Sequence, residues 1–121
     1  MTETVVVVGA SNNEVRYANK AMSLLLEAGH TVIPVTPREA VVLGVPTVKS
    51  IADVTGPVDT ITVYVRPGIL TAKRDDIISL APKRVIFNPG TEDGELMKGL
   101  RDAGIDIIEA CTIVMNKTGQ F

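Results

Sequence analysis

A glycine turn with small polar residues follows the first apolar run of the chain. Gly9-Ala10-Ser11-Asn12-Asn13 comes directly after Thr4–Val8. Glycine permits a tight turn and a close approach of the backbone to a ligand. A helix that starts behind such a turn offers free N–H groups, which attract phosphate. The full Gly-x-Gly-x-x-Gly pattern is absent, because Ser11 and Glu14 stand at its second and third glycine positions. The turn therefore fits either a phosphate-binding loop or an ordinary strand–helix connection.

An arginine takes the place of an acid after the second apolar run. NAD-binding domains usually carry an acidic residue there, which holds the ribose hydroxyls. This chain has Thr36-Pro37-Arg38 after Thr31–Val35, and the first acidic residue after that run is Glu39. The always charged fork of Arg38 suits a phosphate on the ribose. Coenzyme A, with its 3′-phosphate, and NADP, with its 2′-phosphate, therefore fit better than NAD. A solvated surface arginine is the simpler alternative.

The third apolar run ends in another candidate contact with a nucleotide. Val65, Arg66 and Pro67 close and follow the run Thr60–Val65. Val65 and Pro67 would offer an apolar ledge to an adenine ring, and Arg66 would meet a second phosphate. Alternatively, Pro67 only marks the start of the next helix, since proline is favoured in a first turn.

The fourth apolar run, Arg84–Asn88, is followed by Pro89-Gly90-Thr91. Pro-Gly predicts a sharp turn, and Thr91 is expected to cap a helix whose N-terminus points at the same crevice. Glu92 and Asp93 suit the positive end of that helix. Capping therefore explains both acids, and a catalytic carboxylate is the less favoured interpretation.

The remaining reactive side chains supply no catalytic or metal centre. Cys111 follows the fifth run, Asp106–Glu109, and is interpreted as a small apolar filler; a contact with a cofactor thiol is the alternative. His30 is predicted at the opposite end of the sheet. One histidine and one cysteine do not make a zinc site of the usual ligands, and no nucleophile–base pair indicates a triad. We therefore expect no catalytic residue and no metal, and the chain is not expected to be a complete enzyme.

Regular structure must bring these turns together. The five runs are continuous rather than alternating, which is typical of parallel strands covered on both faces. Helical spacing of apolar residues lies between most of them, over residues 18–26, 70–81 and 96–103, with weaker signals for an extended piece at 41–48 and a short helix capped by Ser50. This alternation predicts one Rossmann-type three-layer α/β domain over residues 1–121, with a five-stranded parallel sheet in the order 3-2-1-4-5. The order 2-1-3-4-5 is the alternative, and in both the turns after the strands meet at the C-terminal edge of the sheet.

Composition narrows the class of partner. The net charge is −2 and no basic run exceeds two residues, so no nucleic-acid-binding face is expected. The apolar runs are too short for a membrane span, and the first residues lack the pattern of a signal peptide. A single cysteine agrees with a reducing cytoplasm. These features favour a small molecule as the ligand.

Over nearly its whole length, from Val5 to Cys111, the chain resembles the coenzyme A-binding domain family. Its members are small stand-alone proteins whose fold is similar to the N-terminal domain of the succinyl-CoA synthetase alpha subunit. Each motif is loose alone, but their order and spacing together are specific. The motifs are Val7–Ser11, Val32–Arg38, Leu43–Thr47, Val58–Val65, Asn88–Gly90 and Ala103–Cys111.

The resemblance implies a Rossmann fold that binds the ADP part of coenzyme A. The chain departs from the family at two strand ends. The second strand ends Val-Thr-Pro-Arg rather than Val-Asn-Pro-Lys, so Thr36 replaces an amide. The fourth ends Phe-Asn-Pro, where the family often has Gln or Trp before Gly. The implied contacts are Gly9, Ala10 and Ser11 at the pyrophosphate, Pro37 and Arg38 at the ribose and its phosphate, Val65 and Pro67 at the adenine, and Gly90 and Thr91 on the far side.

The expected function is binding of coenzyme A or an acyl-CoA through its ADP moiety, as a carrier, a sensor or an accessory module. The second synthetase domain, with its phosphorylated histidine, and the ATP-grasp partner have no counterpart in these 121 residues. Two other functions stay open: an NADP-binding enzyme fragment, and an interaction protein of Rossmann fold without a ligand. The expected partners are the cofactor and either a second copy of the chain or an acyl-CoA enzyme.

Overall fold

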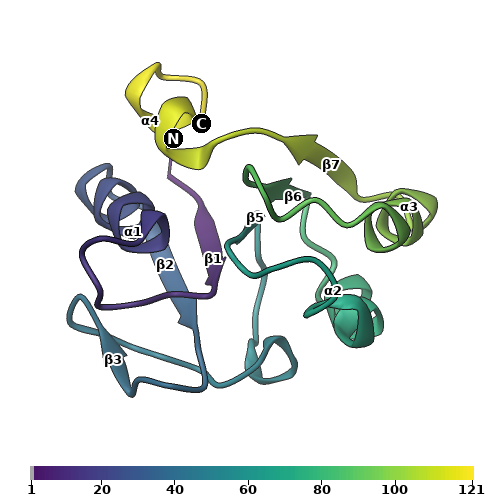
Figure 1. Cartoon of the computed structure of the whole chain (residues 1–121), viewed down its shortest axis with the longest axis horizontal. Helices are drawn as coiled ribbons and strands as arrows, with labels where there is room; N and C mark the ends of the chain where they lie inside the picture. The colour runs from purple at the N-terminus through teal and green to yellow at the C-terminus, as the bar shows by residue number, and fades with distance from the viewer. Residues whose placement is uncertain (1) are drawn as a thin grey trace.

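The computed structural model describes residues 2–121 and contains a five-stranded parallel sheet in the order β2-β1-β5-β6-β7. Helices lie on both sides of this sheet (Figure 1). The predicted α/β class, a parallel sheet between two helical layers, is therefore confirmed. The strands are β1 (Thr4–Val8), β2 (Thr31–Val35), β5 (Thr60–Val63), β6 (Arg84–Phe87) and β7 (Asp106–Glu109).

The helices form two layers that bury alternate residues of the strands. α1 (Tyr17–Glu27) and α4 (Thr112–Lys117) pack together, and α2 (Arg74–Leu80) packs against α3 (Gly94–Asp102) and the 3-10 helix η1 (Ile51–Asp53). A second 3-10 helix, η2 (Thr71–Lys73), leads into α2. Successive side chains of a strand point to opposite faces, so the apolar run of β1 contributes to both cores. One core contains Val5, Val7, Met22 and Leu25, and the other contains Val6, Val8, Ile77, Phe87 and Leu96.

The position of the third predicted strand needs a correction. β5, the run expected third, pairs with β1 and not with β2. Numbered along the chain, the five strands therefore stand in the order 2-1-3-4-5. Val48 forms an isolated parallel bridge with Val35, on the outer side of β2. When Val48 is counted as the third strand, the sheet follows the expected pattern 3-2-1-4-5 and β5 becomes the fourth strand.

The segment between β2 and β5 is more ordered than its sequence pattern indicates. It begins with an antiparallel hairpin of β3 (Val41–Val42) and β4 (Val45–Pro46). This confirms the extended piece expected over 41–48. Ser50 caps η1, because its hydroxyl accepts a hydrogen bond from the N–H of Ala52 at 3.1 Å. No helix among residues 2–121 has the length and apolar character of a membrane span.

The N-terminus of α3 differs from the expectation. Asp93, and not Thr91, is the N-cap, since its carboxylate accepts a hydrogen bond from the N–H of Leu96 at 3.2 Å. Thr91 instead turns inward and donates its hydroxyl to the carbonyl of Asn88 at 2.7 Å. Both residue types cap helices well. Only Asp93 stands directly before the first helical residue, Gly94, with an extended backbone.

Candidate functional site

The turn at Gly9 joins the ends of three neighbouring strands. Gly9 has a φ of +90°, and a Cβ there would lie 3.0 Å from Val65 Cγ1 and 3.1 Å from the carbonyl oxygen of Tyr64. Its N–H and that of Ala10 both donate to the carbonyl of Val35, at 3.0 and 3.3 Å. Glycine is therefore required because the chain leaving β5 packs against the turn. The N–H groups of Gly9 and Ala10 are occupied, so they are not free donors for a phosphate.

The loop behind this turn holds its own hydrogen bonds. The Ser11 hydroxyl accepts from the N–H of Asn13 at 3.0 Å, and the Ser11 carbonyl accepts from the buried side chain of Asn19, also at 3.0 Å. α1 starts only at Tyr17, after an extended Arg16. The expected phosphate would therefore meet loop groups around Ser11 rather than the first turn of a helix.

The residues after β2 divide into a buried anchor and an exposed arm. Thr36 is buried, and its hydroxyl accepts from the N–H of Arg38 at 3.2 Å while its own N–H donates to Val48 at 3.0 Å. Pro37 and Arg38 are exposed. The side chain of Arg38 forms no ion pair with any of residues 2–121. Thr36 thus fixes the backbone, and the guanidinium of Arg38 is free to meet a ligand.

The chain leaving β5 lies beside the Gly9 turn at the same edge of the sheet. Loops after β1 and β5 lead to helices on opposite faces of the sheet, which is the arrangement that opens a ligand crevice at a strand-order reversal. Arg66 and Pro67 are exposed and Val65 is half-buried. These three residues line a narrow pocket with Thr91 and Asp93, and its volume of about 0 Å³ leaves no room for a water molecule. An adenine ring would therefore lie on the rim of this pocket and not inside it.

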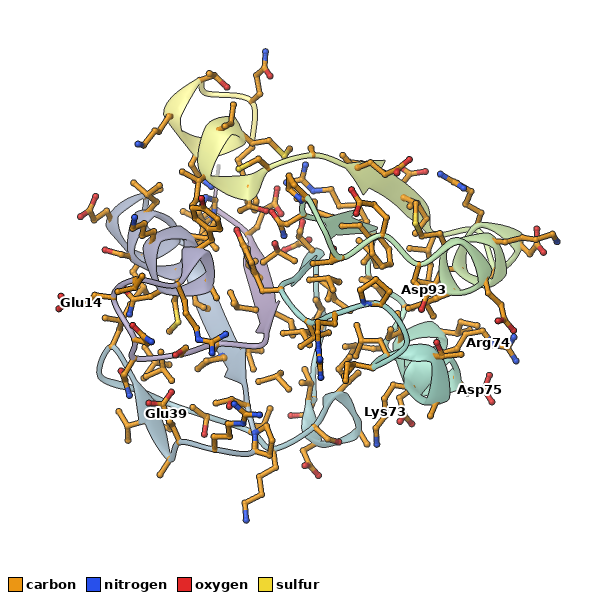
Figure 2. All side chains as sticks on the ribbon, in the orientation of Figure 1. Glu14, Glu39, Lys73, Arg74, Asp75 and Asp93 are labelled. Atoms are coloured by element: carbon orange, nitrogen blue, oxygen red, sulfur yellow. The ribbon has the colours of Figure 1, made fainter. Side chains whose placement is uncertain are left out.

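Asp93 ties the loop after β5 to the loop after β6. Besides capping α3, its carboxylate accepts hydrogen bonds from the N–H of Gly68 and the hydroxyl of Thr71, both at 3.0 Å. The hydrogen bond from the backbone of Leu96, with those from Gly68 and Thr71, lowers the pKa of the Asp93 carboxyl. In Figure 2 Asp93 lies beside α3 and near α2. A charged Asp93 is thus a structural clamp at the edge of the candidate site.

The predicted residues after β6 face in different directions. Gly90 is exposed with a φ of +88°, and its N–H donates to the carboxylate of Glu92 at 2.9 Å. Thr91 is only 8% exposed, with its hydroxyl turned to Asn88. Gly90 is therefore available to a ligand, whereas Thr91 supports the loop from beneath.

Sequence reasoning missed a buried polar junction below this edge. The Asn88 side chain donates to Thr62 Oγ1 at 2.7 Å and to the carbonyl of Val63 at 2.9 Å, and it accepts from the N–H of Thr112 at 2.8 Å. It joins β5, β6 and α4. A polar residue at the end of an apolar run was the one available signal, because the partners lie 24 to 26 residues away in the chain.

Tyr64 adds a buried hydroxyl to this junction. The hydroxyl has no hydrogen-bond partner among residues 2–121. Burial raises the pKa of the Tyr64 phenol, although Thr112 and Thr62 lie near enough to offset part of that rise. Tyr64 is therefore neutral at physiological pH.

Cys111, the N-cap of α4, is half-buried. No three His, Cys, Asp or Glu side chains gather into a metal-binding group among residues 2–121.

A second pocket lies at the opposite end of the sheet. It has a volume of about 670 Å³ and is lined by His30, Arg84 and Phe121, among others. His30 accepts a hydrogen bond at Nδ1 from the N–H of Glu3 at 2.9 Å, so it lies at the amino ends of the strands as expected. The guanidinium of Arg84 forms an ion pair with the Glu3 carboxylate at 3.2 Å and lies over the Phe121 ring, 4.5 Å from its centroid. None of the predicted binding residues lines this pocket.

Comparisons with known proteins agree with the fold. A family model described as a CoA binding domain matches residues 3–117. The "Uncharacterized protein YneT" of Bacillus subtilis (strain 168) is 25% identical over 107 residues, which are 88% of this chain and 79% of that protein.

Solved structures extend the same likeness. A crystal structure of an uncharacterized protein is 39% identical with a TM-score of 0.94 and covers 100% of this chain and 99% of its own. The cell-free ID.343 protein from Thermus thermophilus is 31% identical with a TM-score of 0.89, over 99% of this chain and 91% of its own. The dinucleotide forming acetyl-coenzyme A synthetase 1 of Ca. Korarchaeum cryptofilum shares the fold at 19% identity and a TM-score of 0.77; the match covers 89% of this chain and 25% of that one.

Proposed function

Because this chain belongs to the CoA binding domain family, we propose that it binds coenzyme A or an acyl-CoA through the ADP moiety, at the C-terminal edge of its sheet. The observation that carries the proposal is the family match over residues 3–117, which includes every strand and every loop at that edge. The protein would then act as a carrier, a sensor or an accessory module for an acyl-CoA enzyme. The candidate site holds no nucleophile–base pair, so binding is the function that its residues support best.

The free groups at the edge suggest how the nucleotide lies. The diphosphate would meet the loop that starts at Ser11, and Arg38 would pair with the 3′-phosphate of the ribose. The adenine would rest on Val65 and Pro67, with Arg66 near the phosphates. The backbone at Gly90 faces open space, since a Cβ there would meet nothing within 4 Å. The pantetheine arm would then leave toward the β6 side of the edge.

Replacing Arg38 by alanine tests the contact with the 3′-phosphate. The wild-type protein is expected to bind coenzyme A about tenfold more tightly than dephospho-CoA, because an exposed guanidinium–phosphate pair contributes on the order of 1.4 kcal/mol. In Arg38→Ala the two affinities should become equal. Isothermal titration calorimetry of both ligands with both proteins measures this difference.

Arg101→Ala is the matched control for the loss of one positive charge. Arg101 is exposed near the end of α3, which places it at the opposite edge of the sheet. This variant should keep the tenfold preference. Equal affinity of the wild-type protein for the two ligands would reject the role of Arg38, and tighter binding of NADPH than of coenzyme A would replace the proposed ligand.

A further inference from the structure

The loop that would receive the diphosphate already holds an anion of the protein itself. The carboxylate of Glu39 accepts one hydrogen bond from the backbone N–H of Asn12 and one from the Asn12 side-chain amide, both at 3.0 Å. Glu39 follows Arg38 directly in the sequence and is half-buried. A charged acceptor on two donors forms a strong, oriented contact. These donors lie one residue beyond Ser11, at the place where the proposed function puts a phosphate.

Asn12 also holds the β3–β4 hairpin against this loop. Its side-chain amide donates to the carbonyl of Val41 at 2.7 Å, and its Oδ1 accepts from the N–H of Leu43 at 3.0 Å. Leu43 has a φ of +48° at the tip of the hairpin, a conformation that is costly for a branched side chain. The hairpin and the loop therefore form one unit, with Asn12 at its centre and Glu39 at its edge.

We propose that Glu39 is an internal competitor for the phosphate site on the loop after β1. The proposal rests on the proposed function, since it assigns a regulator to the same site. In the structure the carboxylate occupies the donors of Asn12. A diphosphate must displace it, and until then the two anions repel each other. Glu39 thereby lowers the affinity for ligands that bind through phosphates, while Arg38 beside it raises that affinity.

Glu14 is a natural control for this role of Glu39. It carries the same charge and lies on the loop after β1 itself, but it is exposed and its side chain makes no hydrogen bond or ion pair that the structure shows within residues 2–121. In Figure 2 Glu14 lies at the outer edge of the molecule, whereas Glu39 lies beside β3. A difference between the two glutamates therefore isolates the position of the carboxylate from the charge of the protein.

Calorimetry with coenzyme A on the wild-type protein, Glu39→Gln and Glu14→Gln tests the proposal. Glutamine keeps the shape of Glu39 and removes its charge, so Glu39→Gln is expected to bind coenzyme A about fivefold more tightly. Glu14→Gln should stay within about twofold of the wild-type protein, because exposed charges are screened. An unchanged or weaker affinity of Glu39→Gln, or an equal gain in Glu14→Gln, overturns the proposal.

A second probe separates this proposal from the proposed function. Titration of inorganic pyrophosphate, followed by the NMR signal of the Asn12 backbone amide, should reach its midpoint at an about fivefold lower concentration in Glu39→Gln. If coenzyme A binds none of the three proteins while this shift occurs, the proposed function fails and the role of Glu39 stands. If the pyrophosphate midpoints of wild type and Glu39→Gln coincide, the role of Glu39 is rejected.

Discussion

Replacement of Gly9 by alanine is expected to lower the free energy of unfolding by about 2–4 kcal/mol. Two costs combine at this position. A φ of +90° is strained for any residue with a Cβ, and the new atom would lie 3.0 Å from Val65 Cγ1 and 3.1 Å from the Tyr64 carbonyl oxygen. The Tyr64 backbone is held in the sheet by its N–H, which donates to Val8 at 2.9 Å. It therefore has little freedom to move away, and urea denaturation measures the loss.

Gly56→Ala separates the two costs. Gly56 has a φ of +84°, but a Cβ there meets nothing within 4 Å. This variant should lose only the backbone strain, about 1 kcal/mol. If Gly9→Ala and Gly56→Ala are equally destabilised, the chain leaving β5 does not pack closely against the Gly9 turn.

Replacement of Asn88 by alanine is expected to cost a similar amount, about 2–4 kcal/mol. Asn88 is 3% exposed, and its amide satisfies Thr62, Val63 and Thr112 at once. Removing it takes this partner from the Thr112 N–H and the Val63 carbonyl, while the Thr62 hydroxyl keeps its hydrogen bond with the Thr112 hydroxyl at 2.8 Å. The change lies next to the Tyr64 hydroxyl, which already lacks a partner among residues 2–121. Each unsatisfied buried group carries its full desolvation penalty. Thermal and urea unfolding of the variant measure the effect.

Asn13→Ala is the matched control for this junction. Asn13 is exposed, and its side chain accepts one hydrogen bond, from the N–H of Val15 at 3.1 Å. Its loss should cost less than about 1 kcal/mol, as expected for a surface position. An Asn88→Ala protein that is as stable as Asn13→Ala would show that the junction does not hold α4 on the sheet.

The strands were predictable because their sequence signal is local. Continuous apolar runs such as Thr4–Val8 and Thr31–Val35 need no partner to be recognised, and the structure places both strands at those bounds. The neighbour of Thr60–Val63 was not predictable in the same way. A buried valine or isoleucine pairs equally well with either adjacent strand, and the bridge that completes the β2 side involves one residue, Val48.

The candidate site was predictable in position and less so in detail. Residues after parallel strands gather at one edge whatever the strand order, so Arg38 and Arg66 lie at the same edge of the sheet. The hydrogen-bond partner of each polar group depends on the direction in which its side chain points, which local sequence patterns do not reveal. Thr91 and Asp93 are both good caps, and only the backbone selects Asp93. The pairing of Asn12 with Glu39 spans 27 residues and became visible only through the position of the hairpin.

Mapping coenzyme A on the isotope-labelled protein by NMR tests the binding site most directly. The titration should shift amide signals after β1, β2 and β5, with the largest changes at Ser11, Arg38 and Val65. Signals of His30 and Arg84, which line the pocket at the other end of the sheet, should stay unchanged. Shifts confined to that second pocket, or no shift at saturating coenzyme A, would contradict binding at the C-terminal edge.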